Sequence, residues 1–163
     1  AQRFNVLYKK NIFVEPQELI RQDTAVIVGL DGRKMSKSYD NTIPALIPEK
    51  KLQKLIYRIT TDSLPPEAPK DPNTSHIFEI YKTFASAEKT QLLETRFKEG
   101  IAWGHAKEEL FFLLNDILKE PRKIYDELIQ DEKKLDSLLH LGALKAREIA
   151  APFLDQIKKS IGI

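Results

Sequence analysis

A cationic segment near the N-terminus has the residue types and the spacing to bind phosphate. The sequence RKMSKS occupies residues 33–38, and its two lysines, Lys34 and Lys37, stand beside serine hydroxyls. Lysine is a point charge on a flexible stem, so it can follow negative charge that is spread over phosphate oxygens. Arg33 lies at the edge of the segment and has a weaker claim to a ligand. The pattern therefore favours phosphate binding.

The residues around this segment predict a mobile loop that leaves the end of a strand. AVIV at 25–28 is a short β-branched run that Gly29 ends, and it is the one convincing strand signal in the sequence. Its partners are expected either locally or outside the chain, since a single strand makes no sheet. Gly29 and Gly32 ease reshaping of the backbone up to Pro44. Ligands of open α/β sheets bind beyond strand ends, which favours a functional loop.

Short cationic motifs also recur by chance, and a solvated loop or a phosphorylation site is the alternative for these residues taken alone. The segment is not a Walker A loop, because no Gly-x-x-x-x-Gly-Lys-Ser/Thr pattern occurs. Asp31 and Asp40 are better explained as turn and cap residues than as a metal-binding pair. The histidines lack metal-ligand spacing, so no metal site is predicted.

From residue 48 onward the apolar residues recur with the period of an α-helix. Pro48 suits a helix start because its missing N–H costs nothing there, and Pro121 is expected to kink or restart a longer helix. The sequence predicts a mainly α fold, a bundle of about five or six helices preceded by a small α/β fragment. The expected stripes are Phe4 to Tyr8, Leu52 to Ile59, Ile77 to Phe84, Leu92 to Phe97, Ala106 to Ile129 and Ala146 to Ile161.

The composition excludes several classes of protein. The 163 residues are 42% hydrophobic, enough for a real core, and 26 Lys+Arg against 24 Asp+Glu leave a net charge of only +2. The absence of cysteine excludes disulfides, thiolate nucleophiles and Cys-based zinc sites. No apolar run approaches the ~20 residues that span a bilayer, so no membrane partner is expected. The chain begins in mid-pattern, and we expect it to be part of a larger protein.

The motifs along the chain resemble one family. KMSKS at 34–38 is similar to the second signature of the class I aminoacyl-tRNA synthetases, and GLDGRKMSKSYDNTI at 29–43 resembles its tryptophanyl-tRNA synthetase form. The resemblance covers essentially the whole chain, and the first signature of the family, of the His-x-Gly-His type, is missing. The chain thus resembles the C-terminal portion of such an enzyme. Further stretches agree in order: ITTDS at 59–63, KDP at 70–72, IAWGHAKEEL at 101–110 and LGALKAREIA at 141–150.

The resemblance implies ATP-dependent activation of L-tryptophan to tryptophanyl-adenylate and transfer to tRNA(Trp), with Mg²⁺ bound alongside ATP. It implies that residues 1–47 are a remnant of a Rossmann-like, α/β nucleotide-binding domain and that residues 48–163 are a helical anticodon-binding domain. The full-length protein is expected to be a cytoplasmic homodimer. The chain alone is expected to be inactive, because most of the tryptophan pocket and half of the active site lie outside it. The alternatives are a tyrosyl-tRNA synthetase fragment and a non-catalytic helical RNA-binding module.

The same resemblance assigns roles to residues of the loop. Lys34 and Lys37 are expected to be catalytic and to hold the departing pyrophosphate, with Lys37 the stronger candidate. The remaining ATP contacts are expected from Ile27, as an apolar wall against adenine, and from Met35, Ser36 and Ser38.

Four residues of the helical part are candidates for tRNA binding: Trp103, Lys107, Lys145 and Arg147. Lysine and arginine can pair with phosphates, and an indole can stack on a base. A solvated helix face or an ion-pair partner is the favoured alternative for each cation, and burial between helices is the favoured alternative for Trp103.

Overall fold

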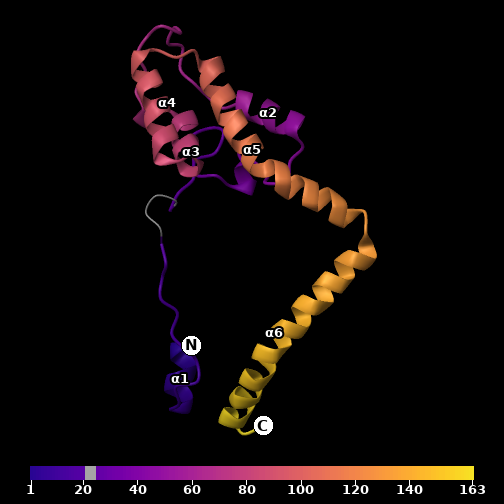
Figure 1. Cartoon of the computed structure of the whole chain (residues 1–163). Coiled ribbons are helices and arrows are strands. Elements are labelled where there is room, and N and C mark those ends of the chain that lie inside the picture. The colour runs from indigo at the N-terminus through magenta and orange to yellow at the C-terminus, as the bar shows by residue number, and fades with distance from the viewer. Residues whose placement is uncertain (21–24) are drawn as a thin grey trace. The chain divides into compact units, whose positions relative to one another are not determined.

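The computed structural model describes residues 1–20 and 25–163 and is built mainly of α-helices (Figure 1). Two short 3-10 turns, η1 (Lys37–Tyr39) and η2 (Pro72–Thr74), accompany them. The mainly α class predicted from the sequence is confirmed. The helices in the described part are α1 (Gln2–Tyr8), α2 (Glu49–Tyr57), α3 (His76–Phe84), α4 (Ala87–Glu99), α5 (Trp103–Ile129) and α6 (Glu132–Ile161).

The described chain divides into two compact units. The loop unit, Ile20–Asp126, holds the cationic segment, α2, α3, α4 and most of α5, and the terminal unit combines Ala1–Leu19 with Glu127–Ile163. This division by packing does not test the predicted functional division at residue 47, which stays a prediction. The predicted first domain also includes residues 21–24, which lie outside the described part.

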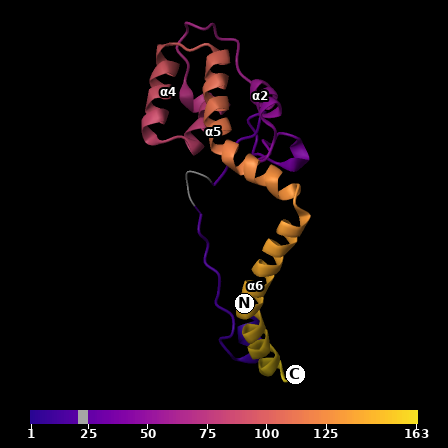
Figure 2. The ribbon, with the colours of Figure 1, turned by 45° about the vertical axis from the view of Figure 1, so that its right-hand side comes forward.

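The core of the loop unit forms where four helices bring their apolar stripes together. Figures 1 and 2 show α2, α3 and α4 gathered around the first half of α5. Leu52, Ile77, Phe97 and Leu110, one from each of these helices, are all 0% exposed. Full burial of such a side chain stabilises a fold by about 1.5–3 kcal/mol. The helical periodicity predicted for these segments is confirmed.

Serine side chains fix where two of these helices begin. The Ser75 hydroxyl accepts a hydrogen bond from the N–H of Phe78 at 3.3 Å, and the Ser86 hydroxyl accepts one from Lys89 at 3.3 Å. Both caps satisfy donors that the first turn of a helix leaves unpaired. Gly100 follows the last residue of α4 and has a φ of 101°. A Cβ added there would lie 2.5 Å from the carbonyl oxygen of Glu67, so the position has no room for a side chain.

The strand predicted at residues 25–28 is wrong. No β-strand occurs in the described residues, and this segment makes a single antiparallel bridge between Val28 and Lys34. A strand requires a partner of several residues. Here the chain turns back at once through Asp31 and Gly32, so the pairing is local and one bridge long. The proposed α/β remnant therefore has no sheet in the described part of the chain.

α5 continues through Pro121 instead of restarting there. Proline removes one backbone donor from a helix interior, and the neighbouring Arg122 supplies donors in the same region. Its guanidinium donates to the carbonyl oxygen of Leu118 at 3.1 Å, of Asn115 at 3.1 Å and of Ile47 at 3.3 Å. Arg122 thus joins the middle of α5 to the chain segment that precedes α2.

In the terminal unit, α1 is fixed by Asn5 and by a series of aromatic contacts. The Asn5 side chain accepts hydrogen bonds from the N–H groups of Ile12 and Phe13, at 3.1 and 3.0 Å, and donates to the Phe13 carbonyl at 2.7 Å. The Phe13 ring lies 4.8 Å from that of Phe4 and 5.3 Å from that of Phe153 in α6. The helix predicted from Phe4 to Tyr8 is confirmed.

α6 begins earlier than predicted and contributes nothing to a buried core. The Asp131 side chain caps it by accepting the Lys134 N–H at 3.0 Å, well before the expected stripe at Ala146. None of its residues is buried, and Ile149 is 79% exposed. The predicted bundle is therefore limited to α2–α5 within the described residues. No described helix has both the length and the apolar character to cross a bilayer.

Candidate functional site

The first residues of the cationic segment close a tight turn with the residues before them. We call this turn, residues 27–35, the hairpin. The Met35 N–H donates to the Ile27 carbonyl at 2.8 Å, and the Gly29 N–H donates to the Arg33 carbonyl at 2.7 Å. These bonds close the turn from both sides. The first half of the cationic segment is therefore held by its own backbone.

The second half of the segment is the 3-10 turn η1. The Ser36 hydroxyl caps it by accepting the N–H of Ser38 at 3.3 Å, and the Ser36 carbonyl accepts the N–H of Tyr39 at 3.1 Å. Asp40 follows with a left-handed φ of 50°, a conformation that aspartate tolerates better than most residues. Lys37 therefore opens a short turn whose ends are set by Ser36 and Asp40.

A buried asparagine, Asn41, ties the hairpin to η1. Its side chain is 2% exposed, and its Nδ2 donates to Asp31 Oδ1 at 2.7 Å and to the Lys34 carbonyl at 3.3 Å. Its Oδ1 accepts the N–H of Ser36 at 2.8 Å, and its backbone carbonyl accepts the N–H of Leu30 at 3.0 Å. Asn41 was not predicted as a site residue, because in the sequence an asparagine after a loop looks like any other turn residue.

Asp31 and Arg33 form an ion pair at the tip of the hairpin. Arg33 Nη2 lies 2.6 Å from Asp31 Oδ2, and the guanidinium carbon lies 4.3 Å from the centre of the Tyr39 ring. Hydrogen bonding from Asn41 above all, with help from Arg33, lowers the pKa of Asp31 from 3.8 to about 2. Arg33 thus acts within the loop, which agrees with its weaker claim to a ligand.

Lys34 and Lys37 combine a fixed backbone with exposed side chains. Both side chains are exposed, while the Lys34 carbonyl is held by Asn41 and the Lys37 carbonyl accepts the N–H of Asp40 at 3.2 Å. Cations presented in this way lose little conformational entropy when they bind an anion, because only the side chains need to be ordered. The arrangement is suited to holding a chain of phosphates.

Ile27 and Met35 lie on the same apolar cavity, which has a volume of about 150 Å³. The rest of its lining comes from the segment that follows η1 and from helices α3 and α5, with Ile43, Ile80 and Leu114 among the contributors. The structure thus brings together Ile27, predicted as an apolar wall against adenine, and Met35, predicted to contact ATP. Both contacts stay predictions.

The tip of the hairpin rests directly on the helices. The Leu30 carbonyl accepts the N–H of Thr60 at 3.0 Å, just after α2. Gly32 has a φ of 81°, and a Cβ added to it would lie 2.2 Å from the His76 ring at the start of α3. The loop is therefore positioned by contacts near the end of α2 and at the start of α3. These contacts were not predicted from the sequence.

Two tRNA-binding candidates have structural partners in the loop unit. The Trp103 indole N–H donates to Asp62 Oδ1 at 3.0 Å, and its ring meets that of Phe97 edge-on at 5.8 Å. The Lys107 ammonium donates to the Tyr57 carbonyl at 2.9 Å, at the last residue of α2, and partial burial lowers its pKa. Trp103 is half-buried and Lys107 binds a backbone carbonyl, and a role in tRNA binding stays a prediction for both.

A buried lysine organises the long loop between α2 and α3. Lys70 is 3% exposed, and its ammonium donates to the carbonyls of Pro65, Pro66 and Ala68 at 2.8, 3.2 and 2.9 Å. The ammonium also lies 5.4 Å from the centre of the Trp103 ring. Lysine is almost never fully buried unless it is paired in this way. The sequence showed only a lysine among prolines, so this role was not predicted.

The other two tRNA-binding candidates lie in the terminal unit. Lys145 and Arg147 are exposed on α6. They thus belong to a different compact unit from Trp103 and Lys107, and their predicted role is not tested.

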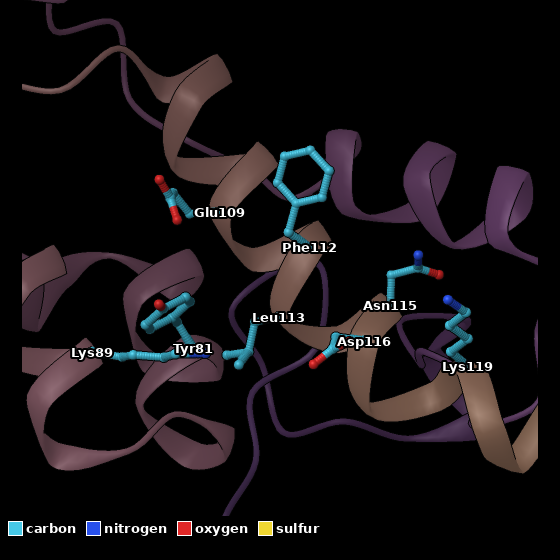
Figure 3. Close-up of a pocket in the computed structure, with 8 residues that line it drawn as sticks. All are labelled: Tyr81, Lys89, Glu109, Phe112, Leu113, Asn115, Asp116 and Lys119. Atoms are coloured by element: carbon cyan, nitrogen blue, oxygen red, sulfur yellow. The ribbon is translucent and has the colours of Figure 1, made fainter.

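A separate hollow of about 440 Å³ lies between α3, α4 and α5 (Figure 3). Tyr81, Lys89 and Glu109 are among its lining residues, and Glu109 is paired with Arg96 at 2.5 Å. Burial, with the nearby charge of Glu109, raises the pKa of Tyr81. None of the residues predicted for a functional site lines this hollow.

Metal-binding residues do not cluster in the described part of the chain, which has no group of three or more His, Cys, Asp or Glu side chains suited to a metal ion. Asp31, the carboxylate of the hairpin, is already engaged by Asn41 and Arg33. Among the residues that the structure describes, none is therefore assigned to Mg²⁺.

Comparison with known proteins identifies the family. A family model described as tRNA synthetases class I (W and Y) matches residues 1–134. The chain belongs to this family, the class I tRNA synthetases of the tryptophan and tyrosine type.

The relatives lie on the tryptophan side of the family. The tryptophan–tRNA ligase of Pseudomonas aeruginosa is 46% identical over the whole chain, which spans 37% of that protein, and that of Neisseria meningitidis is 41% identical, with 48% spanned. A crystal structure of the tryptophanyl-tRNA synthetase from Campylobacter jejuni, complexed with ADP and tryptophan, matches 100% of this chain and 51% of its own, with a TM-score of 0.83 and 40% identity. The predicted resemblance is confirmed, and the chain spans about half or less of these relatives.

Proposed function

We propose that this chain is the C-terminal portion of a tryptophan–tRNA ligase and carries its ATP loop together with its helical anticodon-binding domain. The observation that carries the proposal is the match of the whole chain to the ADP- and tryptophan-bound Campylobacter jejuni enzyme, with a TM-score of 0.83. The full-length protein would activate L-tryptophan with ATP and transfer it to tRNA(Trp). We further propose that it acts in the cytoplasm as a homodimer.

In the proposed reaction, the tryptophan carboxylate attacks the α-phosphorus of ATP and the bond to pyrophosphate breaks. The leaving pyrophosphate gains negative charge, so the step is accelerated by cations that are already in place. Lys34 and Lys37 meet this need, because their side chains are exposed on a backbone that is held on both sides. Mg²⁺ bound with ATP would neutralise part of the same charge.

The remaining contacts with ATP are proposed from the same segment. Ile27 and Met35, which share one apolar cavity, would contact the adenine ring. Ser36 and Ser38 would contact the nucleotide through the exposed side of η1, where the Ser36 hydroxyl already caps the turn. Trp103, Lys107, Lys145 and Arg147 remain the proposed contacts with tRNA(Trp).

The test is the amino-acid dependence of ATP–pyrophosphate exchange by the full-length protein that contains this chain. We expect exchange with tryptophan and none with tyrosine. We expect the 163-residue chain alone to be inactive, because it spans only 37% of the Pseudomonas aeruginosa relative and 51% of the Campylobacter jejuni structure. Exchange with tyrosine would favour a tyrosyl-tRNA synthetase. Absence of all exchange, together with salt-sensitive binding of tRNA(Trp) by the chain, would favour an RNA-binding module.

A further inference from the structure

Asn41 holds the two parts of the cationic segment that carry the lysines. One carboxamide reaches Asp31 and the Lys34 carbonyl in the hairpin and the Ser36 N–H at the start of η1. We propose that Asn41 is a positioning residue of the ATP loop, whose carboxamide sets the placement of Lys34 and Lys37 without touching a substrate atom. This inference rests on the proposed function.

The chemistry at this position requires an amide. The Asn41 carboxamide donates both hydrogens of Nδ2, and the nitrogen lies 2.7 and 3.3 Å from the two acceptor oxygens. Its Oδ1 accepts a hydrogen bond from the Ser36 nitrogen at 2.8 Å. A carboxylate of the same shape has no donor at neutral pH, and it would face the carboxylate of Asp31. An alanine would leave the half-buried N–H of Ser36 without its side-chain acceptor, and such a loss destabilises the local structure.

The space around the carboxamide is equally specific. A Cβ added to Gly29 would lie 2.4 Å from the Asn41 side chain, so the amide packs closely against the glycine backbone. Asn41 is 2% exposed and leaves no room for a longer side chain there. Gly29, which was expected to ease reshaping of the loop backbone, thus also provides the surface against which the Asn41 side chain packs.

The anchors of Asn41 lie on both sides of Met35, between the two lysines. The Lys34 carbonyl precedes Met35, and the Ser36 N–H follows it and leads into Lys37. Without the carboxamide, the described hydrogen bonds no longer join the hairpin to the start of η1, and the stacking of Arg33 on the Tyr39 ring is the side-chain contact that remains between them. A displacement of a catalytic group by 1 Å can lower a rate by about 10²-fold, and it does so without altering the binding of a substrate elsewhere.

The central variant is Asn41→Ala in the full-length protein, compared with Asn73→Ala, which removes another asparagine from the exposed turn η2. We expect kcat for tryptophan-dependent exchange to fall by about 10²-fold with KM for tryptophan unchanged. Asn73→Ala is expected to leave kcat unchanged. An unchanged kcat in Asn41→Ala overturns the inference, and so does an equal loss in both variants.

Exchanging the carboxylate of residue 31 and the carboxamide of residue 41 separates a positioning role from a general loss of structure. Asn41→Asp alone places two carboxylates side by side and is expected to lower kcat. Combining it with Asp31→Asn restores a donor–acceptor pair between the two positions and keeps the Ser36 N–H satisfied, so that of the three bonds only the one to the Lys34 carbonyl is missing. The double variant is expected to recover kcat relative to Asn41→Asp. Failure to recover, in a protein of unchanged Tm, contradicts the role assigned to the pair.

A readout on the 163-residue chain is independent of the enzyme activity. The Ser36 amide donates to the Asn41 side chain, and the Leu30 amide donates to the Asn41 backbone carbonyl. In Asn41→Ala we therefore expect faster hydrogen exchange at Ser36 and unchanged exchange at Leu30, which keeps its backbone acceptor. If the Ser36 amide stays protected, Asn41 does not position the loop. If the full-length protein lacks exchange activity while the Ser36 amide responds, the proposed function fails and the anchoring by Asn41 stands.

Discussion

Asp31 reports the state of the loop at the scale of a single residue. Its pKa is lowered from 3.8 to about 2, chiefly by the hydrogen bond from Asn41. A lowered pKa means that the fold favours the carboxylate. The resulting stability is complete above pH 3.8 and is lost as the pH falls toward about 2. The loop is therefore expected to keep its hydrogen bonds throughout the neutral range.

The pKa of Asp31 gives a direct prediction. In the 163-residue chain, the carboxyl carbon of Asp31 followed by NMR should titrate with a midpoint at about 2. In Asn41→Ala the pKa should move up toward 3.8, because its largest cause is removed. Asn73→Ala should leave the midpoint in place. The same midpoint in Asn41→Ala as in the unaltered chain contradicts the bonding described for Asp31.

The residues that could be proposed from the sequence and those that could not differ in a physical way. Lys34 and Lys37 could be proposed because their charge and spacing are visible in the sequence itself. Asn41 and Lys70 are buried polar groups, 2% and 3% exposed, and their partners are backbone atoms that only the folded loop brings together. No local pattern marks a side chain of this kind.

At the scale of elements, local order was predictable and pairing was not. The stripes of α3 and α5 follow from periodicity, and the helices formed where that periodicity lies. The β-branched run at 25–28 makes one bridge instead of a strand, since β-structure depends on a partner. α6 shows the same limit for a helix, because a stripe predicts an apolar face but not what will cover it.

The contrast between α5 and α6 leads to a stability prediction with matched substitutions. Leu110→Ala removes a side chain that is 0% exposed in the core, and Leu139→Ala removes one that is 63% exposed on α6. We expect the first to lower the free energy of unfolding of the chain by about 3 kcal/mol. The second should change it by less than about 0.5 kcal/mol.

Urea unfolding followed by far-UV circular dichroism, which reports the helices of both units, measures this difference. Equal losses of stability in Leu110→Ala and Leu139→Ala would mean that the core described for α2–α5 is misplaced.

At the scale of the whole molecule, the chain combines one structured loop unit with a terminal unit. Its family was predictable because the motifs are local and occur in a fixed order, and the match over residues 1–134 confirms it. The chain spans 51% of the Campylobacter jejuni enzyme. In the proposed account the ATP loop is therefore complete in itself, while the surface that it closes on is contributed by residues outside this chain.

The central claim is that Lys37 acts on the leaving pyrophosphate. The most direct test is kcat for tryptophan-dependent ATP–pyrophosphate exchange by the full-length protein with Lys37→Ala, compared with Lys50→Ala, an exposed lysine at the start of α2. We predict that Lys37→Ala lowers kcat by about 10²–10³-fold with a smaller effect on KM for tryptophan, as expected for lost electrostatic stabilisation of the transition state. Lys50→Ala should leave kcat as it is. An unchanged kcat in Lys37→Ala would contradict the account.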